Sequence, residues 1–198
     1  RRTNEDRLED EHGRLTDVGA TLLAPLRAGT ITCVNAFGAG VADDKLMHAY
    51  VEKMVRFYLA EEPLLGSVRT YDVGVPDVRS AVLERIDELV IKPRAGFGGV
   101  GVVIAPHAAP EDVRRIAADL KREPEDYVAQ ETIMLSRHPT AADGRLEPRH
   151  IDLRPFVLLA RDCAHVIPGG LTRVAASREA LVVNSSQEGG AKDTWVLS

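Results

Sequence analysis

A lysine and four glycines lie close together in residues 89–103, which read LVIKPRAGFGGVGVV. Lys92 ends a short apolar run, and a second apolar run, residues 100–104, follows the glycines. The glycines are Gly96, Gly98, Gly99 and Gly101. This pattern predicts a strand, a glycine-rich hairpin loop and a second strand. Glycine lets backbone N–H groups approach a ligand closely, and a loop of such donors beside a lysine suits a polyphosphate.

The loop alone leaves two interpretations open, a nucleotide site and an ordinary hairpin whose lysine is solvated. It matches neither common nucleotide loop, because GxxxxGK[ST] is absent and GxGxxG would need a helix to follow, whereas β-type sequence continues. A second lysine, Lys45, stands in the first turn of a helix expected from about Asp44 to Ala60. The helix dipole disfavours a cation there unless an anion shares the site, so Lys45 is either simply exposed or a second anion contact.

Length, charge and cysteine usage narrow the class of protein. The 198 residues suffice for one sizeable domain or two small ones, and the net charge of −5 gives no reason to expect a nucleic-acid or anionic-membrane partner. No apolar run approaches the roughly 20 residues that span a bilayer, and the charged first residues lack a signal-peptide core. We therefore expect a cytoplasmic protein, and the missing initiator Met indicates a piece of a longer chain. Cys33 and Cys163 lie in apolar runs and are expected to be buried free thiols.

The order of elements predicts an α+β fold rather than regular βαβ units. Helices are expected at residues 17–27, 44–60, after 77 and from 110, with Asp17, Asp43 and Asp77 as caps and Pro110 at a helix start. Strands are expected at residues 31–35, on both sides of the glycines, and at 127–133, 151–159, 163–167, 171–175 and 181–183. The expected inward side chains of the last three helices are Leu46, Tyr50, Met54 and Phe57, then Val78, Val82, Ile86 and Leu89, then Val113, Ile116, Ala117 and Leu120.

Two polar segments, residues 136–149 and 184–193, are expected to be surface loops. His138 and His150 lie near the ends of the first. Lone loop histidines are more typical of solvated side chains than of metal ligands, and nothing here has metal-ligand spacing.

Five segments in this order resemble the circularly permuted ATP-grasp family. They read VNAFGAGVADDK, VIKPRAGFGGVGVVI, YVAQE, HIDLRPFVL and VNSSQEGGAKDTWVL, and together they run along nearly the whole chain. The resemblance implies an ATP-grasp fold in which two α+β subdomains with antiparallel sheets enclose ATP. One subdomain, with the glycine hairpin and a hinge strand, is expected at about residues 77–133, and residues 1–76 and 134–198 are expected to form the other subdomain and the connectors.

The resemblance also implies roles for individual residues. Lys92 and Lys45 would hold phosphate, and the four glycines would form a lid over it. Gln130 and Glu131 would lie in the hinge beside the nucleotide, with Glu131 contacting the adenine or ribose. On the later strands and loop, the matching residues are Asp152, Arg154, Arg173, Asn184, Gly189, Gly190 and Lys192. Of these, Asp152 and Asn184 are expected to bind the nucleotide, whereas Arg154, Arg173 and Lys192 are expected to be catalytic.

The circular permutation implied by the resemblance moves the metal-binding strand pair ahead of the lysines. Asn35 then matches the metal-binding asparagine, Glu5 or Asp6 the acidic ligand, and Arg1 or Arg2 an arginine near the transferred phosphate. Oxygen ligands of this kind suit Mg²⁺. The sequence departs from the family pattern at Cys33, where a glutamate is usual, and in the segment Asn4-Glu5-Asp6, where an aspartate pair is usual.

The activity that the resemblance implies is Mg²⁺-dependent, ATP-driven joining of a carboxylate to an amine through an acylphosphate. Small-molecule or peptide acids and amines would be the substrates, and an α-helical companion protein is an expected partner. Three alternatives remain: a phosphotransferase, a non-catalytic ATP-binding module that acts with a partner protein, and an α+β domain without an ATP site.

Overall fold

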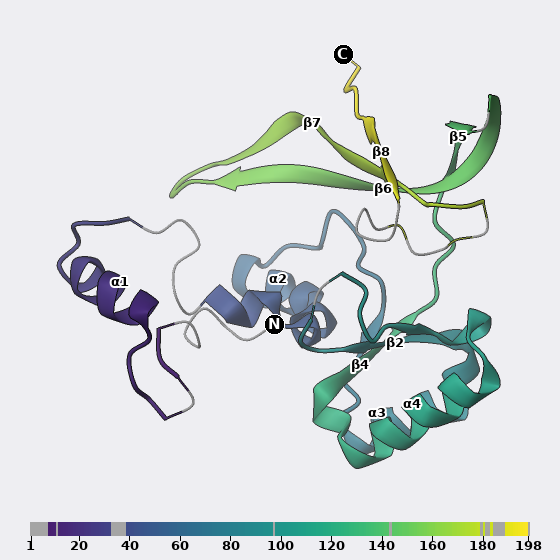
Figure 1. Cartoon of the computed structure of the whole chain (residues 1–198), viewed down its shortest axis with the longest axis horizontal. Coiled ribbons are helices and arrows are strands. Elements are labelled where there is room, and N and C mark those ends of the chain that lie inside the picture. Colours follow the sequence, from purple (N-terminus) through teal and green to yellow (C-terminus); the bar gives the residue numbers. More distant parts are fainter. Residues whose placement is uncertain are drawn as a thin grey trace. The chain divides into compact units, whose positions relative to one another are not determined.

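The computed structural model describes residues 8–10, 12–32, 39–96, 98–142, 144–178, 180, 183 and 189–197 (Figure 1). The chain divides into two units, Arg1–Thr132 and Ile133–Ser198. Each unit holds one antiparallel sheet, and the mixture of helices with antiparallel sheets confirms the α+β class. No helix in the described part of the chain is long and apolar enough to cross a membrane.

The first helix, α1 (Asp17–Arg27), has the predicted bounds. Its N-cap is Thr16 rather than Asp17, because the Thr16 hydroxyl accepts a hydrogen bond from the Gly19 N–H at 3.0 Å. Asp17 instead places its charge in the first turn, where the helix dipole favours an anion.

The second predicted helix is broken into two pieces. After the 3₁₀ turn η2 (Ala39–Asp43), a second 3₁₀ turn, η3 (Lys45–Ala49), leads into α2 (Val51–Leu59). The cap is Asp44, not Asp43: the Asp44 carboxylate accepts from the Leu46 N–H at 2.9 Å. A 3₁₀ helix has three residues per turn instead of the 3.6 of an α-helix. The side chains that follow η3 therefore point in other directions than the α-helical spacing predicts. Phe57 is consequently 80% exposed, and its predicted place on the core face is wrong.

The sheet of the first unit has the order β1-β4-β2-β3. Its strands are β1 (Thr70–Tyr71), β2 (Leu89–Pro93), β3 (Val103–Ile104) and β4 (Tyr127–Glu131). The glycine hairpin therefore joins β2 to β3, as predicted, although β3 is shorter than expected. Residues 1–76, expected with residues 134–198, are instead grouped with this sheet, and β1 within them pairs with β4.

Two helices, α3 (Pro76–Glu84) and α4 (Pro110–Arg122), lie beside this sheet (Figure 1). Short 3₁₀ turns, η4 (Ile86–Glu88), η5 (Ala105–His107) and η6 (Pro124–Asp126), connect the elements. Both helices begin at a proline, whose fixed φ suits the first helical turn. The N-cap of α3 is Val75 and has no side-chain cap bond, so Asp77 does not cap it as predicted.

The core of the first unit lies between its sheet and these helices. The buried side chains are Val73, Val82, Ile86, Leu89, Ile91, Ile116, Leu120 and Ala129. Val82 on α3 and both Ile116 and Leu120 on α4 are predicted inward positions that lie in this cluster, and Val78, Val113 and Ala117 pack against it. Ile86 and Leu89 are also buried, but they lie in η4 and β2, because α3 ends at Glu84. Leu89 and Ile91 on β2 point into this core. Because side chains alternate along a strand, those of Val90 and Lys92 point to the other face of the sheet.

The second unit is a four-stranded antiparallel sheet with the order β5-β6-β7-β8. Its strands are β5 (Arg137–Ala142), β6 (Arg145–Leu159), β7 (Ala164–Val174) and β8 (Gly190–Asp193). The predicted surface loop at residues 136–149 is thus wrong, because β5 and β6 form a hairpin there. Ala142 pairs with Arg145, and the intervening sequence is Asp-Gly, a strong hairpin signal.

Three smaller predictions for this unit are also corrected. The predicted strands at 163–167 and 171–175 are parts of one continuous strand, β7, which runs from Ala164 to Val174, and residues 190–193 of the second predicted loop form β8. Cys163 is exposed rather than buried, because it lies in the turn between β6 and β7, where the Ala160 N–H donates to its carbonyl. Cys33 lies outside the described residues.

Candidate functional site

Lys92 lies on the face of the first sheet that is opposite the core. Its neighbour Ile91 is fully buried on the core side, so the alternation of the strand directs Lys92 the other way. The Lys92 ammonium donates a hydrogen bond to the side-chain oxygen of Gln130 on β4. Burial lowers the pKa of Lys92 from its ordinary value, and the positive charge of Lys45 lowers it further. The structure therefore brings the two predicted phosphate lysines near each other.

Lys45 lies against the start of the glycine loop. Its ammonium donates to the carbonyl of Gly96 at 2.9 Å and to the carbonyl of Arg94 at 3.2 Å. The predicted role of Lys45 as a second phosphate contact thus has a geometric basis, since the loop and the lysine share one location. None of the ion pairs of the described residues includes Lys45 or Lys92.

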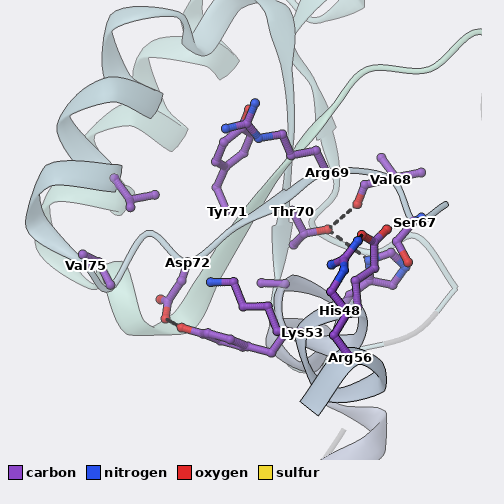
Figure 2. Close-up of a pocket in the computed structure, with 14 residues that line it drawn as sticks. His48, Lys53, Arg56, Ser67, Val68, Arg69, Thr70, Tyr71, Asp72 and Val75 are labelled. Atoms are coloured by element: carbon purple, nitrogen blue, oxygen red, sulfur yellow. Dashed lines mark hydrogen bonds and ion pairs between the residues drawn. The ribbon is translucent and has the colours of Figure 1, made fainter. Parts of the chain in front are cut away.

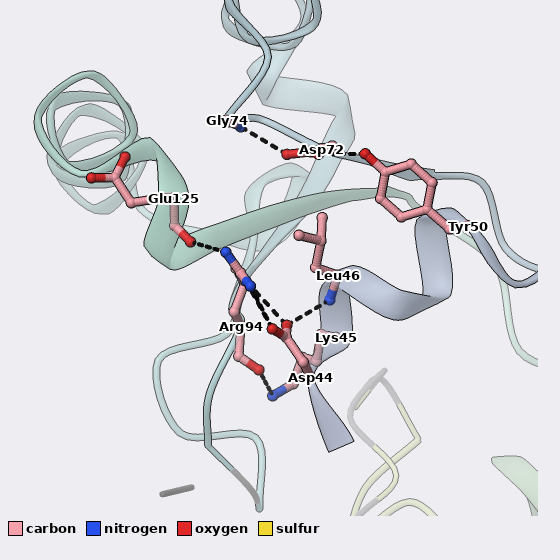
Figure 3. A network of polar contacts seen from close by, with 8 residues as sticks. All are labelled: Asp44, Lys45, Leu46, Tyr50, Asp72, Gly74, Arg94 and Glu125. Carbon is pink, nitrogen blue, oxygen red and sulfur yellow. Dashed lines mark hydrogen bonds and ion pairs between the residues drawn. The ribbon is translucent and has the colours of Figure 1, made fainter. Parts of the chain in front are cut away.

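Arg94 is a residue of this site that the sequence analysis missed (Figure 3). Its guanidinium makes a bidentate contact with the Asp44 carboxylate, with Nε–Oδ1 at 3.1 Å and Nη2–Oδ2 at 2.5 Å. The third nitrogen, Nη1, donates a hydrogen bond to the Glu125 carbonyl at 2.7 Å. Arg94 holds the pKa of Asp44 below its ordinary value. Because Asp44 caps η3 just before Lys45, this pair ties the helical lysine to the strand that carries Lys92. An arginine directly after the Lys-Pro pair was the available signal.

All four glycines of the loop have positive φ: 119° for Gly96, 68° for Gly98, 78° for Gly99 and 73° for Gly101. Side chains other than glycine rarely adopt such angles, so this loop needs its glycines. At Gly101 there is a second constraint, because a Cβ would lie 2.8 Å from the Pro93 Cγ.

We expect Gly101→Ala to destabilise the loop conformation seen in the structure by about 1–3 kcal/mol, from backbone strain and the Pro93 contact together. The free energy of unfolding and the affinity for a non-hydrolysable ATP analogue would both fall. Gly66→Ala is the matched control, because a Cβ there meets nothing within 4 Å. Equal values for Gly101→Ala and Gly66→Ala would contradict a conformational role for Gly101.

The two hinge residues point in different directions. Gln130 is 9% exposed and faces Lys92. Glu131 is engaged elsewhere: it accepts hydrogen bonds from the Tyr71 hydroxyl and, at 2.9 Å, from the Arg85 guanidinium. The Tyr71 hydrogen bond and then Arg85 lower the pKa of Glu131. The structure thus does not bring the Glu131 carboxylate to the lysines, and its adenine or ribose contact stays a prediction.

The lowered pKa of Glu131 predicts an acid-sensitive contribution to stability. A carboxyl whose pKa is lower in the folded state stabilises the protein above its ordinary value of 4.5, and this stabilisation is lost as the pH falls through the folded pKa. Glu131→Gln should therefore be less stable than the wild type at pH 7, with a flatter loss of stability below pH 4.5. Denaturation midpoints between pH 3 and 7 measure this, with exposed Glu84→Gln as control. Parallel curves for wild type and Glu131→Gln would refute it.

A cavity of about 580 Å³ opens beside β1 (Figure 2). Its lining includes His48, Tyr50, Lys53, Arg69, Thr70 and Asp72. The Tyr50 hydroxyl donates to Asp72 at 2.5 Å, which raises the pKa of Tyr50. Cationic, carboxylate and hydroxyl groups therefore line the cavity together.

In the second unit, Asp152 on β6 and Arg173 on β7 are register partners and form an ion pair, with Nε–Oδ1 at 2.8 Å. Asp152 raises the pKa of Arg173. Arg154 lies two residues after Asp152 on the same strand, so both share one sheet face, and Arg154 is exposed. The structure brings these three predicted residues together.

Lys192 lies apart from that group. Lys192 lies on β8, and its register partner on β7 is Thr172, the neighbour of Arg173. Because neighbouring residues of a strand point to opposite faces, Lys192 and Arg173 lie on opposite faces of the sheet. The Lys192 ammonium lies 3.0 Å from His138 Nδ1 and donates to the Pro139 carbonyl. Gly189 and Gly190 precede it at the start of β8.

His150 is buried, contrary to the predicted solvated loop histidine. It is 1% exposed, its Nδ1 lies 2.9 Å from the Leu135 carbonyl, and its Nε2 accepts from Arg137 at 3.2 Å. The carbonyl can only accept, so Nδ1 carries the proton. With both ring nitrogens occupied, His150 is a structural residue of the β5–β6 hairpin.

The predicted metal site falls on residues that the structure does not describe. Glu5, Asp6 and Asn35 lie outside the described residues, as do Arg1, Arg2 and Asn184. Within the described ranges, no group of three or more His, Cys, Asp or Glu side chains could hold a metal ion. The metal assignment therefore stays a prediction.

Comparison with known proteins adds independent evidence. Residues 1–175 match the family described as circularly permuted ATP-grasp type 2. The chain is 47% identical over 176 residues to an uncharacterized protein of Synechocystis, and the match covers 89% of this chain and 37% of that protein. It is 45% identical over 197 residues to a protein of Frankia casuarinae named "Putative glutamate–cysteine ligase 2-2", covering 99% and 23%, and 45% identical over 179 residues to an uncharacterized protein of Mycobacterium tuberculosis, covering 90% and 32%.

These relatives are much longer than this chain, which spans between 23% and 37% of their lengths. The family match, by contrast, covers most of the chain, and it includes Lys45, the glycine hairpin, the hinge strand and the Asp152–Arg173 pair. The chain therefore belongs to the circularly permuted ATP-grasp family, type 2.

Proposed function

We propose that this chain binds ATP as part of an ATP-dependent carboxylate–amine ligase. The observation that carries the proposal is the location of Lys45 and Lys92 at the base of the glycine hairpin. The charge of one lowers the pKa of the other, and neither is neutralised by an ion pair among the described residues. Two adjacent cations beside flexible N–H donors form a site that a polyphosphate would stabilise.

Each described residue would have a limited task in this reaction. Lys45 and Lys92 would hold phosphate oxygens, and the glycine loop would close and exclude water. Exposed Arg154 is available to screen the incoming carboxylate, whereas Arg173 is held by Asp152 and would be the positioned partner of the pair. Positioning and charge neutralisation are the main contributions that a protein makes to phosphoryl transfer.

The proposed chemistry proceeds in two steps. A carboxylate oxygen attacks the γ-phosphorus and ADP leaves, which gives an acylphosphate. The amine nitrogen then attacks the acyl carbon, phosphate leaves with the bonding electrons, and the nitrogen loses a proton. Mg²⁺ would neutralise phosphate charge, held by Asn35 with Glu5 or Asp6, whose oxygens have the chemistry that Mg²⁺ prefers.

The ligase class is favoured over two alternatives by the name of the Frankia relative, which refers to a glutamate–cysteine ligase. We propose small-molecule or peptide acids and amines as substrates. A phosphotransferase would use the same phosphate contacts but release a stable phosphorylated product. A non-catalytic module would bind ATP and act through a partner, such as an α-helical companion protein, and the cysteine at position 33 is the feature that favours it.

Calorimetry with a non-hydrolysable ATP analogue, with and without Mg²⁺, tests binding, and an assay of ADP and phosphate release with panels of acids and amines tests turnover. Release that requires both an acid and an amine supports the ligase. A phosphorylated acid formed without an amine indicates the phosphotransferase, and tight Mg²⁺-independent binding without turnover indicates the module. Absence of nucleotide binding overturns the proposal.

A further inference from the structure

A row of polar side chains crosses the first sheet from Lys92 on β2 to His48 on η3. The Lys92 ammonium donates to the Gln130 side-chain oxygen, and Gln130 Nε2 donates to the Thr70 hydroxyl at 2.7 Å. His48 Nδ1 lies 3.1 Å from the same hydroxyl (Figure 2). Thr70 and Gln130 are register partners on β1 and β4, so the sheet itself holds these two members side by side.

The donor and acceptor inventory fixes the part of this row between Lys92 and Thr70. The Thr70 hydroxyl accepts from Gln130 Nε2, and its own proton has two acceptors within reach, the Val68 carbonyl at 3.0 Å and, in one tautomer, His48 Nδ1 at 3.1 Å. The Gln130 amide must direct its NH₂ to Thr70 and its oxygen to Lys92, and an ammonium, which has only donors, can use no other end of the amide.

We infer that Thr70 and His48 are positioning residues that hold Lys92, through Gln130, where it can meet a phosphate. The inference rests on the proposed function and adds residues that no sequence motif marked. A lysine is a point charge on a flexible four-carbon stem, so its location depends on what its ammonium contacts. Without the Thr70 hydroxyl, the Gln130 NH₂ would lose its acceptor, and the contact with Thr70 would no longer fix the amide that holds Lys92.

Gln130 itself supports this division of roles. It is 9% exposed, and its side-chain oxygen and nitrogen are both occupied by Lys92 and Thr70. A buried amide whose two ends are already satisfied is a support for its neighbours. His48, at the other end, lines the cavity beside β1 and is exposed, so the row ends at a solvent-accessible group.

Thr70→Val tests the inference, because valine keeps the shape and the strand preference of threonine but lacks the hydroxyl. Thr70→Ser is the matched control, since it keeps the hydroxyl. We expect Thr70→Val to weaken binding of a non-hydrolysable ATP analogue about fivefold to tenfold, and Thr70→Ser to stay within about twofold of the wild type. Thermal denaturation of each variant establishes that it is folded.

A second measurement needs no nucleotide. The ¹³Cε resonance of Lys92 reports its titration by NMR, and Gln130 accepting from the ammonium favours the charged form. Among the described residues, Lys45 on η3 is the charged group that acts on Lys92. Thr70→Val should move the Lys92 midpoint to lower pH, and Thr70→Ser should leave it unchanged.

The two measurements separate the inference from the proposed function. A Lys92 midpoint and an ATP affinity that are the same in Thr70→Val and Thr70→Ser overturn the positioning role. If Thr70→Val lowers the Lys92 midpoint but the wild-type protein binds no nucleotide, the hydrogen-bonded row is supported and the ATP site is refuted.

Discussion

Replacing Lys92 by methionine is expected to lower the affinity for ATP about 100-fold, the size of losing a charge-assisted hydrogen bond in a partly desolvated site. Methionine keeps most of the length and apolar character of the lysine stem, so the change removes mainly the charge. Lys92 lies on the sheet face opposite the core, and no carboxylate among the residues that the structure describes forms an ion pair with its ammonium. Calorimetry with a non-hydrolysable ATP analogue measures the loss.

Lys121→Met is the matched control for Lys92→Met. Lys121 is an exposed lysine on α4, so the variant has the same change in net charge at a site away from the glycine loop. We expect its ATP affinity to stay within about threefold of the wild type, because exposed charges are screened by solvent and salt. An unchanged affinity in Lys92→Met, or an equal loss in both variants, would remove Lys92 from the phosphate site.

The parts of the fold that sequence patterns predicted well are those governed by local rules. The glycine hairpin, the inward faces of α3 and α4 and the strand β4 follow from periodicity and from proline and glycine positions within short stretches. Asp17, Asp43 and Asp77 were each predicted as a helix N-cap, and the observed N-cap lies one or two positions away in each case. The choice between neighbouring cap residues depends on the backbone angle at one position, which a pattern of residue types does not specify.

The site was predicted less completely because its contacts join distant segments. Arg94 and Asp44 are fifty positions apart in sequence, and Gln130 and Thr70 are sixty apart. Sequence motifs selected residues one at a time, so they could mark Lys45 and Lys92 but not the groups that hold them. The motifs can also unite residues that the structure separates. Lys192 and Arg173 were both predicted to be catalytic, whereas the register of β7 and β8 places them on opposite faces of the sheet.

Arg94→Lys is expected to destabilise the first unit by about 1–3 kcal/mol and to lower ATP affinity about tenfold, although the charge is preserved. Lysine cannot hold both oxygens of Asp44 and also reach the Glu125 carbonyl as the planar guanidinium does. Asp44 and Arg94 are each less than one-third exposed, so little solvent replaces the lost contacts. Affinity would fall because η3, and Lys45 with it, would no longer be held against the hairpin.

The control for Arg94→Lys is Arg122→Lys. Arg122 also contacts two carboxylates, Asp119 and Glu123, but its side chain is 63% exposed. Exposed pairs of this kind contribute little, so we expect a change in stability of no more than about 0.5 kcal/mol and no change in ATP affinity. A similar loss for both arginine variants would show that the Asp44 contact has no special importance.

A double-mutant cycle with Asp44→Asn decides whether the pair itself links the two lysines. If Arg94 acts on Lys45 through Asp44, the double variant should lose little more ATP affinity than either single variant, because the same contact is already broken. The pKa of Asp44 is lowered in the folded protein, so its contribution to the free energy of unfolding should be lost as the pH falls below 3.8. In Asp44→Asn, the free energy of unfolding should depend less on pH in this range. Strictly additive losses of ATP affinity would mean that Arg94 and Asp44 act independently. The hydrogen bonds to the loop carbonyls alone would then position Lys45.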